Sequence, residues 1–202
     1  MKFWGLIMVT LSFAAQAQER LPTIPPSAYD EAQKKAAEDF LAARKTPVFG
    51  PFEPLIYSPE LMSQARAMGD YLRFKSALGN RLSELVILLT ARDWTQDYEW
   101  HVHAPIAAKT GISEAIIQAI RDGRRPVSMS ADETIVYDMT MELLRTKRVS
   151  NESFANIEQR FGKQGAVDLA GIVGYYSFLA LELNMAQYRV PKDGTPLPRF
   201  PE

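Results

Sequence analysis

Apolar residues recur every three to four positions along most of this chain, which is the spacing of amphipathic α-helices. Caps and helix breakers divide this pattern into eight predicted helices, which run over approximately residues 28–45, 59–78, 82–93, 96–110, 114–123, 132–147, 150–161 and 163–187. No segment shows the strict alternation of a β-strand, and we find no internal repeat. The pattern therefore predicts an all-α helical bundle with a single domain.

Serines, prolines and glycines mark the expected ends of these helices. Ser27 is a candidate N-cap for the first helix, and Gly79-Asn80 is expected to end the second. Residues 46–59 contain four prolines and are predicted to form a long loop over the core. The aromatic residues of this loop would hold it against the protein or line a pocket; they are Phe49, Phe52 and Tyr57.

The two ends of the chain differ from the helical middle. Lys2, an apolar run and Ala15-Gln16-Ala17 predict a signal peptide over residues 1–17, so we expect a periplasmic or secreted protein. No later apolar segment approaches the ~20 residues of a transmembrane helix, so no membrane contact is expected after cleavage. The rest divides into an N-terminal helix with a proline-rich loop (18–57), the main helical domain (58–188) and a proline-rich tail (189–202).

Composition narrows the functional classes. The 202 residues carry a net charge of -1, which gives no indication of a nucleic-acid or anionic-membrane partner. The chain has no cysteine, which excludes disulfides, thiol peroxidase chemistry and thiolate metal sites.

The segment from Leu82 to Ala108 holds both histidines and the densest group of titratable residues. Its first part is apolar on nearly every helical face, which indicates a buried helix. A very short turn follows, so the next helix is expected to pack antiparallel to the first and to bring Glu84 level with His103. Glu99 lies four residues before His103 and shares its helical face. Such carboxylate–imidazole contacts fix the tautomer of histidine and support proton transfer.

Neighbouring residues suggest further features of this site. Pro105 is expected to kink or break the second helix just after His103 and to favour a cavity there. Glu99 and His103 could also form an ordinary surface pair. A metal site is not expected, because His101 and His103 point about 200° apart on a helix and cannot chelate one ion. Arg92 is a structural ion-pair partner or a ligand for a substrate carboxylate.

The run ELVILLTARDWTQDYEWHVHAPIAAKTGISEAIIQAI resembles the carboxymuconolactone decarboxylase family, which is related to alkylhydroperoxidase D. The peroxidase branch carries Glu, eleven residues, Cys, two residues, Cys, three residues and His. This chain keeps the frame with Glu84 and His103, while Gln96 and Glu99 occupy the cysteine positions. The Glu-Trp-His arrangement followed by Ala-Pro resembles the decarboxylase-like branch.

The resemblance implies an alkylhydroperoxidase D-like helical bundle that assembles as a homo-oligomer, a trimer or hexamer, with sites near subunit contacts. Peroxidase activity is not expected, because neither Gln nor Glu replaces a redox thiolate. We instead expect a cofactor-independent acid–base enzyme, a lyase or isomerase, acting on a small carboxylated lactone or related acid. His103 would donate the proton, and Glu84 would orient the His103 ring. Glu99 would be a second acid/base group, and Gln96, Trp100 or Arg92 would hold the substrate.

Two other interpretations stay open at this point. A non-catalytic ligand-binding or assembly protein would bury Glu84 against His103 with no cavity beside them. A metal-dependent enzyme would need Glu84, Glu99 and His103 to converge on one point.

Overall fold

The computed structural model describes residues 20–191 and 194–199. Within these ranges the chain forms eight α-helices and no strand, which confirms the all-α prediction. A 3₁₀ turn (Pro26–Ala28) precedes the helices, whose bounds are α1 Glu31–Arg44, α2 Phe52–Leu55, α3 Pro59–Phe74, α4 Gly79–Asp93, α5 Asp97–Lys109, α6 Glu114–Arg121, α7 Ala131–Thr146 and α8 Asn151–Ala186. The expected signal peptide, residues 1–17, lies outside the described residues.

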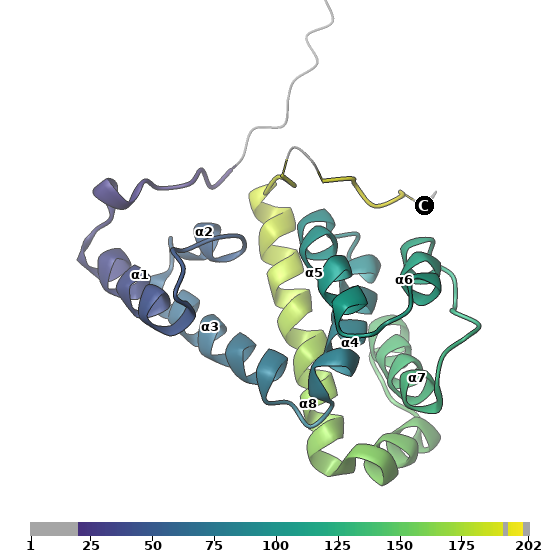
Figure 1. The fold of residues 1–202 in the computed structure, drawn as a ribbon. Coiled ribbons are helices and arrows are strands. Elements are labelled where there is room, and N and C mark those ends of the chain that lie inside the picture. The colour runs from purple at the N-terminus through teal and green to yellow at the C-terminus, as the bar shows by residue number, and fades with distance from the viewer. Residues whose placement is uncertain (1–19, 192–193, 200–202) are drawn as a thin grey trace, which may run out of the picture.

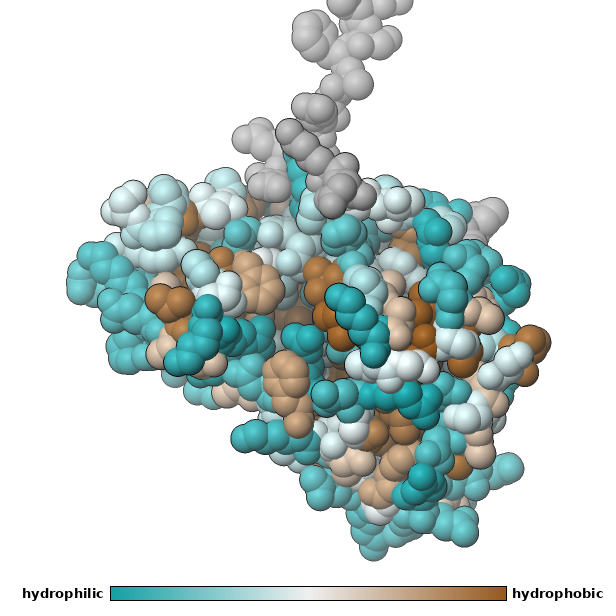
Figure 2. All heavy atoms as spheres, viewed as in Figure 1, coloured by the Kyte–Doolittle hydropathy of each residue, from teal (hydrophilic) through white to brown (hydrophobic). Residues whose placement is uncertain are grey.

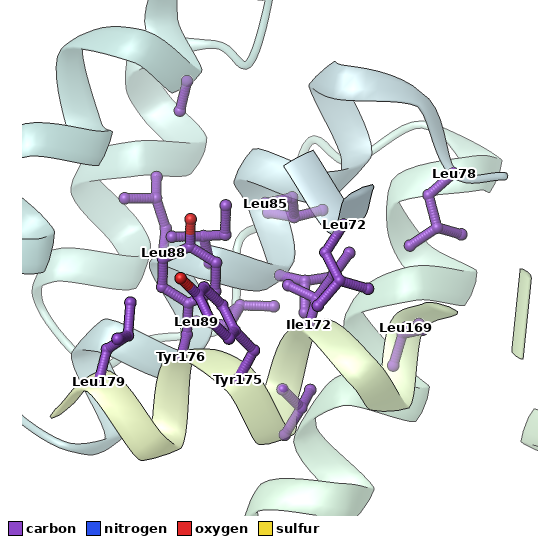
Figure 3. Close-up of a cluster of buried hydrophobic side chains, with 14 of the residues drawn as sticks. Leu72, Leu78, Leu85, Leu88, Leu89, Leu169, Ile172, Tyr175, Tyr176 and Leu179 are labelled. Atoms are coloured by element: carbon purple, nitrogen blue, oxygen red, sulfur yellow. The ribbon is translucent and has the colours of Figure 1, made fainter. Parts of the chain in front are cut away.

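Helices α4 and α8 form the centre of the molecule, with α1 to α3 on one side and α5 to α7 on the other (Figure 1). Every residue of α4 from Leu82 to Arg92 is buried, as its apolar sequence predicts. Leu85 and Leu88 of α4 lie in one cluster with Ile172 and Leu179 of α8 (Figure 3). This packing fixes the position of the two helices that surround the candidate site.

Helix α8 bends at Gly162, whose backbone angles (φ 70°, ψ 176°) are not helical. The two parts correspond to the two helices expected on either side of this residue. The whole of α8 (Asn151–Ala186) is long and apolar enough to cross a membrane, contrary to our expectation, but 61% of its most apolar window is buried inside the protein. Burial on this scale is typical of the core helix of a bundle. The first glycine after the bend, Gly165, is itself buried.

Most predicted helix ends are confirmed, and the exceptions have local causes. Asp30, and not Ser27, caps α1, because its carboxylate accepts the backbone N–H of Gln33 in a capping box. Helix α3 ends at Phe74, before the predicted end at Gly79-Asn80, and Gly79 is the first residue of α4. The predicted loop also contains the single turn of α2.

Helix α5 continues through Pro105 to Lys109, so the expected break after His103 is wrong. A proline removes only its own backbone donor, and the helix keeps its other bonds and the buried contact of Ala107. Gly171 allows α8 to approach α3 closely, since a Cβ there would lie 3.1 Å from Leu72 Cδ2. Gly174 has no such neighbour.

On the face shown in Figure 2, hydrophobic residues form small separate groups among hydrophilic ones. Exposed large apolar side chains occur on several helices, including Leu61 and Phe74 on α3 and Val167 and Leu181 on α8. Single exposed apolar residues are normal on protein surfaces and do not by themselves indicate a site.

Candidate active site

Glu84, His103 and Glu99 form a buried line of carboxylate, imidazole and carboxylate. His103 Nδ1 lies 2.7 Å from Glu84 Oε2, which is a hydrogen bond. His103 Nε2 lies 3.5 Å from Glu99 Oε2, beyond an ordinary hydrogen bond. The three residues are only 5%, 4% and 3% exposed, respectively. The structure therefore excludes the ordinary surface pair.

The antiparallel packing of α4 and α5 brings these residues together, as the short turn predicts. Thr95 makes the turn with a left-handed backbone (φ 48°), which is uncommon for a β-branched residue. Gln96 then caps α5, because its Oε1 accepts the backbone N–H groups of Tyr98 and Glu99. Its amide Nε2 also donates to Asn184 Oδ1 of α8 at 3.0 Å. The turn is thus fixed at both of its ends.

Side chains from α3 and α8 complete the surroundings of the imidazole. The ring of Tyr176 packs edge-on against His103, with 5.1 Å between ring centroids. Arg73 Nη2 lies 3.8 Å from Glu84 Oε1 and places a positive charge beside that carboxylate. His103 therefore lies between two carboxyl groups, and Arg73 is closest to that of Glu84.

A cavity of about 40 Å³ adjoins this line of residues. Glu99, His103 and Arg73 line it together with aromatic residues of the α1–α2 segment, α5 and α8, among them Phe49, Phe52, Tyr98, Tyr175 and Tyr176. The prediction that the loop aromatics pin the loop or line a pocket is confirmed for Phe49 and Phe52, whereas Tyr57 does not reach this cavity. A space of this size holds only a few water molecules.

Two buried polar atoms on residues that line this cavity have no hydrogen-bond partner among the described residues, namely Arg73 Nε and Glu99 Oε1. One is a donor with positive charge and the other belongs to a carboxyl group. Buried polar atoms without partners cost stability, so their presence beside a cavity indicates a site for a ligand.

Burial changes the acid–base properties of the site. Burial raises the pKa of the Glu99 carboxyl, an effect that the nearby His103 and Arg73 oppose. Burial, together with Glu99 and Glu53, raises the pKa of Tyr98 to about 12. The pKa of Glu182 on α8 rises to about 8 through burial and the charge of Glu99, and neither of its oxygens has a partner among the described residues. Glu99 and Glu182 are thus protonated more readily than free glutamates.

The residues expected to bind substrate lie elsewhere. Gln96 is the cap of α5, and Trp100 faces a different hollow beside His101 and Pro105. Arg92 lines a third hollow near the other end of α4. The structure thus separates these three from the cavity beside His103, which corrects their predicted place.

Glu84, Glu99 and His103 do not have the arrangement that a metal-dependent enzyme would require. Glu84 and Glu99 approach opposite nitrogens of the His103 ring, so the three side chains do not meet at one point. Among the described residues, no group of three or more His, Cys, Asp or Glu side chains is arranged to hold a metal ion.

Sequence reasoning did not identify Arg73, Tyr175, Tyr176 and Glu182. Arg73 stands near the end of an amphipathic helix, where its spacing gives no indication of a site. Glu182 carried a usable signal, because it is a single charge in the apolar run LALELNMA. A lone carboxylate within a buried helix indicates a functional candidate.

No protein-family model and no curated protein matches this chain. Solved structures do match it, among them the following two. One is a protein of unknown function from Agrobacterium tumefaciens, described in relation to the antioxidant defence protein AhpD, with a TM-score of 0.61, 15% identity, and coverage of 69% of this chain and 96% of that one. The other is the alkylhydroperoxidase AhpD core of an uncharacterized peroxidase-related protein from Ralstonia eutropha, with a TM-score of 0.70, 15% identity, and coverage of 89% and 95%. At this identity the comparisons show the fold alone: the chain has an AhpD-like all-α fold.

Proposed function

We propose that this protein is a cofactor-independent acid–base enzyme of the lyase or isomerase type, and that it acts on a small carboxylated lactone or a related organic acid. One observation carries the proposal. His103 is buried between Glu84 and Glu99 beside a cavity whose other lining includes an arginine.

Glu84 is the orienting group. Glu84 Oε2 accepts the Nδ1–H of His103, which leaves the lone pair of Nε2 directed away from Glu84 and toward Glu99. The other oxygen of the Glu84 carboxyl group lies 3.8 Å from Arg73 Nη2. His103 is thereby prepared to accept or return a proton at Nε2.

Glu99 is the second acid/base group. Its raised pKa favours the protonated carboxyl, which can donate a proton to the substrate or to His103 Nε2. The 3.5 Å separation between Nε2 and Glu99 Oε2 is long for direct transfer, as is common when no substrate is bound. A substrate atom between the two groups would exchange protons with both.

Glu99 and His103 can supply the proton that the expected lyase reaction needs. The bond between the substrate carbon and its carboxylate breaks, and its electron pair moves into the conjugated lactone carbonyl as carbon dioxide leaves. The carbon of the resulting enolate then takes a proton from Glu99 or from protonated His103, and solvent reprotonates this donor. An isomerase would use the same groups to remove a proton at one carbon and return it at another.

Arg73 is the substrate-binding residue that we propose in place of Arg92, Gln96 and Trp100. It lines the cavity, its Nε has no partner among the described residues, and its contact with Glu84 is long at 3.8 Å. A guanidinium with a free donor suits a substrate carboxylate. Arg44 also lines the cavity but is held by Asp70 at 2.9 Å, so it is less available.

The small volume of the cavity requires a movement before substrate enters. A pocket for a small organic molecule usually measures some 300 Å³ or more, against about 40 Å³ here. Phe49, Pro51 and Phe52 form one wall, and they belong to the proline-rich segment between α1 and α3. We propose that this segment shifts to admit the substrate.

The peroxidase-related description of the structural neighbour is not proposed for this chain. A disulfide-cycling peroxidase uses two thiols, and this chain has no cysteine. Export to the periplasm or outside the cell and assembly into a trimer or hexamer stay part of the proposal.

The same small cavity supports a second candidate, a non-catalytic ligand-binding or assembly protein on this fold. In that case the buried line of Glu84, His103 and Glu99 would be a structural network. The two candidates differ in whether any substrate exchanges protons with solvent.

A proton NMR assay in D₂O tests the proposal with a panel of small carboxylated lactones and unsaturated acids. The wild-type protein is expected to release carbon dioxide from one of these compounds or to place deuterium on its carbon. His103→Gln is expected to lower the rate by about 10²- to 10⁴-fold, the usual contribution of a general acid–base group.

His101→Gln is the matched control, because His101 lies on the same helix and does not line the cavity. Its rate should equal that of the wild type. Full activity of the His103 variant would exclude the acid–base role, and a panel in which no compound reacts would support the binding protein.

A further inference from the structure

A second cavity lies near the C-terminal end of α4, separate from the His103 site. It measures about 240 Å³, six times the volume beside His103, and the two cavities have no lining residue in common. Residues of the α4–α5 turn, of the end of α6 and of α7 enclose it. The acid–base chemistry proposed above makes no use of this space.

The charged lining of this cavity is mostly positive. Arg92, Arg124 and Arg145 line it from three different parts of the chain, against one carboxylate, Asp93. Arg92 is 7% exposed, and burial together with the charge of Arg199, which does not line the cavity, lowers its pKa, while Asp97 and Asp93 oppose this shift. Because three guanidinium groups and one carboxylate line the cavity, a bound anion would balance its excess positive charge.

Arg124 and Arg145 stand at the more accessible side of the cavity. Arg124 contacts Asp122 at 2.8 Å, but the pair lies at the surface, with 64% of the Arg124 side chain and 35% of the Asp122 side chain exposed, and such pairs contribute little. Arg145 is exposed on α7. Both can therefore turn toward a ligand at small cost.

The remaining lining is apolar. Leu89 of α4, Ile120 of α6 and Met141 of α7 contribute to the wall beside the arginines. This combination of an apolar wall and several guanidinium groups suits a ligand that has an oxyanion at one end and a short apolar body.

The backbone beside the cavity supports a ligand site. Thr95 lines the cavity with a left-handed conformation (φ 48°) that β-branched residues rarely adopt. Its hydroxyl accepts a long hydrogen bond, 3.5 Å, from Arg92 Nη1. Strained backbone of this kind occurs preferentially at functional sites.

We propose that Arg92, Arg124 and Arg145 form a second binding site for a small organic anion, in which the guanidinium groups hold a carboxylate or phosphate and Leu89, Ile120 and Met141 contact the apolar body. The sequence offered Arg92 as a structural ion-pair partner or as a ligand for a substrate carboxylate; the present proposal gives it a ligand role at a cavity separate from His103.

Isothermal titration calorimetry of the full chain at low salt tests this site with two probes. Sodium benzoate carries a carboxylate and an apolar ring, and inorganic phosphate carries only the oxyanion. We expect one benzoate per chain, bound more tightly than phosphate because only benzoate contacts the apolar wall, and weaker binding of both probes at high salt. Phosphate binding alone would reduce the proposal to an oxyanion site and contradict the apolar part.

Charge-removing variants locate the binding. Arg145→Gln is expected to weaken benzoate binding about tenfold, which corresponds to the loss of one charge-assisted hydrogen bond. Arg92→Gln should have at least this effect; because Arg92 is buried and this variant can lose its fold, Arg124→Gln provides an independent exposed test. Arg148→Gln, an exposed arginine three residues after Arg145 that does not line the cavity, is the matched control.

Two further outcomes would overturn the proposal. If benzoate binds equally well to the Arg145 and Arg124 variants, or does not bind the wild type at all, the cavity is no anion site. If Arg73→Gln abolishes the binding instead, the probe occupies the His103 cavity. His103→Gln should leave benzoate binding unchanged even if it removes all catalysis, so the two proposals can fail separately.

Discussion

Glu133 and Glu99 are buried to the same degree but differ in their partners. Glu133, 5% exposed at the start of α7, accepts hydrogen bonds from Arg81 Nη1 and from the backbone N–H of Ser130, the latter at 2.7 Å. Glu99, 3% exposed on α5, has one oxygen without a partner among the described residues and the other 3.5 Å from an imidazole nitrogen.

The difference shows that burial alone does not assign a role to a carboxylate. Glu133 completes a capping box and an ion pair, and these contacts stabilise the fold. The surroundings of Glu99 favour its neutral form and leave a donor or acceptor free at a cavity, which costs stability. The second arrangement is typical of acid–base groups in active sites.

The largest expected effect concerns Glu99 itself. Glu99→Gln removes the proton donor but keeps a neutral side chain of the same shape, so the turnover rate should fall about 10²-fold or more. The free energy of unfolding should stay the same or rise, because Glu99 makes no close ion pair or short hydrogen bond that the substitution would remove. Kinetics and thermal melting measure the two effects. A large loss of stability with full activity would show that Glu99 has a structural role and no catalytic one.

Glu133→Gln is the matched substitution in the other surroundings. It removes the charge that faces Arg81, so we expect the free energy of unfolding to fall by about 1–3 kcal/mol. The turnover rate should not change, because Glu133 does not line the His103 cavity. Denaturant unfolding measures the loss, and a reduced rate in a folded variant would contradict the purely structural role.

Gly50→Ala tests how closely the segment between α1 and α3 packs against α5 beside the Glu99 cavity. Gly50 has a left-handed backbone (φ 58°), and a Cβ there would lie 2.4 Å from the Tyr98 hydroxyl. We expect a loss of about 1–2 kcal/mol in the free energy of unfolding. Gly174→Ala is the control, since a Cβ there meets nothing within 4 Å, and it should not destabilise the helix.

A smaller effect is expected in the pH dependence of stability. Glu182 has a pKa of about 8 in the folded protein against 4.5 for the free side chain, so the folded state binds more protons between these values. Its contribution to stability is therefore fully present below about pH 4.5 and is lost as the pH rises toward 8. Glu182→Gln should flatten the decline of the melting temperature across this window, and an unchanged decline would show that Glu182 titrates normally.

The helices and the central pair of the site were predictable because they depend on short-range patterns. Apolar spacing located the helices, and a short turn between two of them placed Glu84 opposite His103. The direction of each polar residue on α4 was not predictable, since that helix is apolar on all faces. Glu84 and Arg92 lie about 80° apart around its axis at 100° per residue, so they reach different cavities.

Contacts between distant segments account for the other differences. Arg73 reaches the site only because α3 packs beside α4 and α8, which no local pattern specifies. Gln96 was expected to hold substrate from its place in the family frame, yet the residue directly before a helix is also its N-cap, and that local role holds in the structure. The unexpected continuation of α5 through Pro105 likewise reflects packing that outweighs a local preference.

We propose that Glu99, whose pKa burial raises, holds a proton beside His103 at neutral pH. An infrared difference spectrum between the wild-type protein and Glu99→Gln tests it directly, because a protonated carboxyl and a carboxylate absorb at different frequencies. We predict that the wild type shows the carbonyl band of a protonated carboxylic acid at pH 7, and that this band disappears in the variant and in the wild type at high pH. A difference spectrum with only carboxylate bands at pH 7 would contradict it.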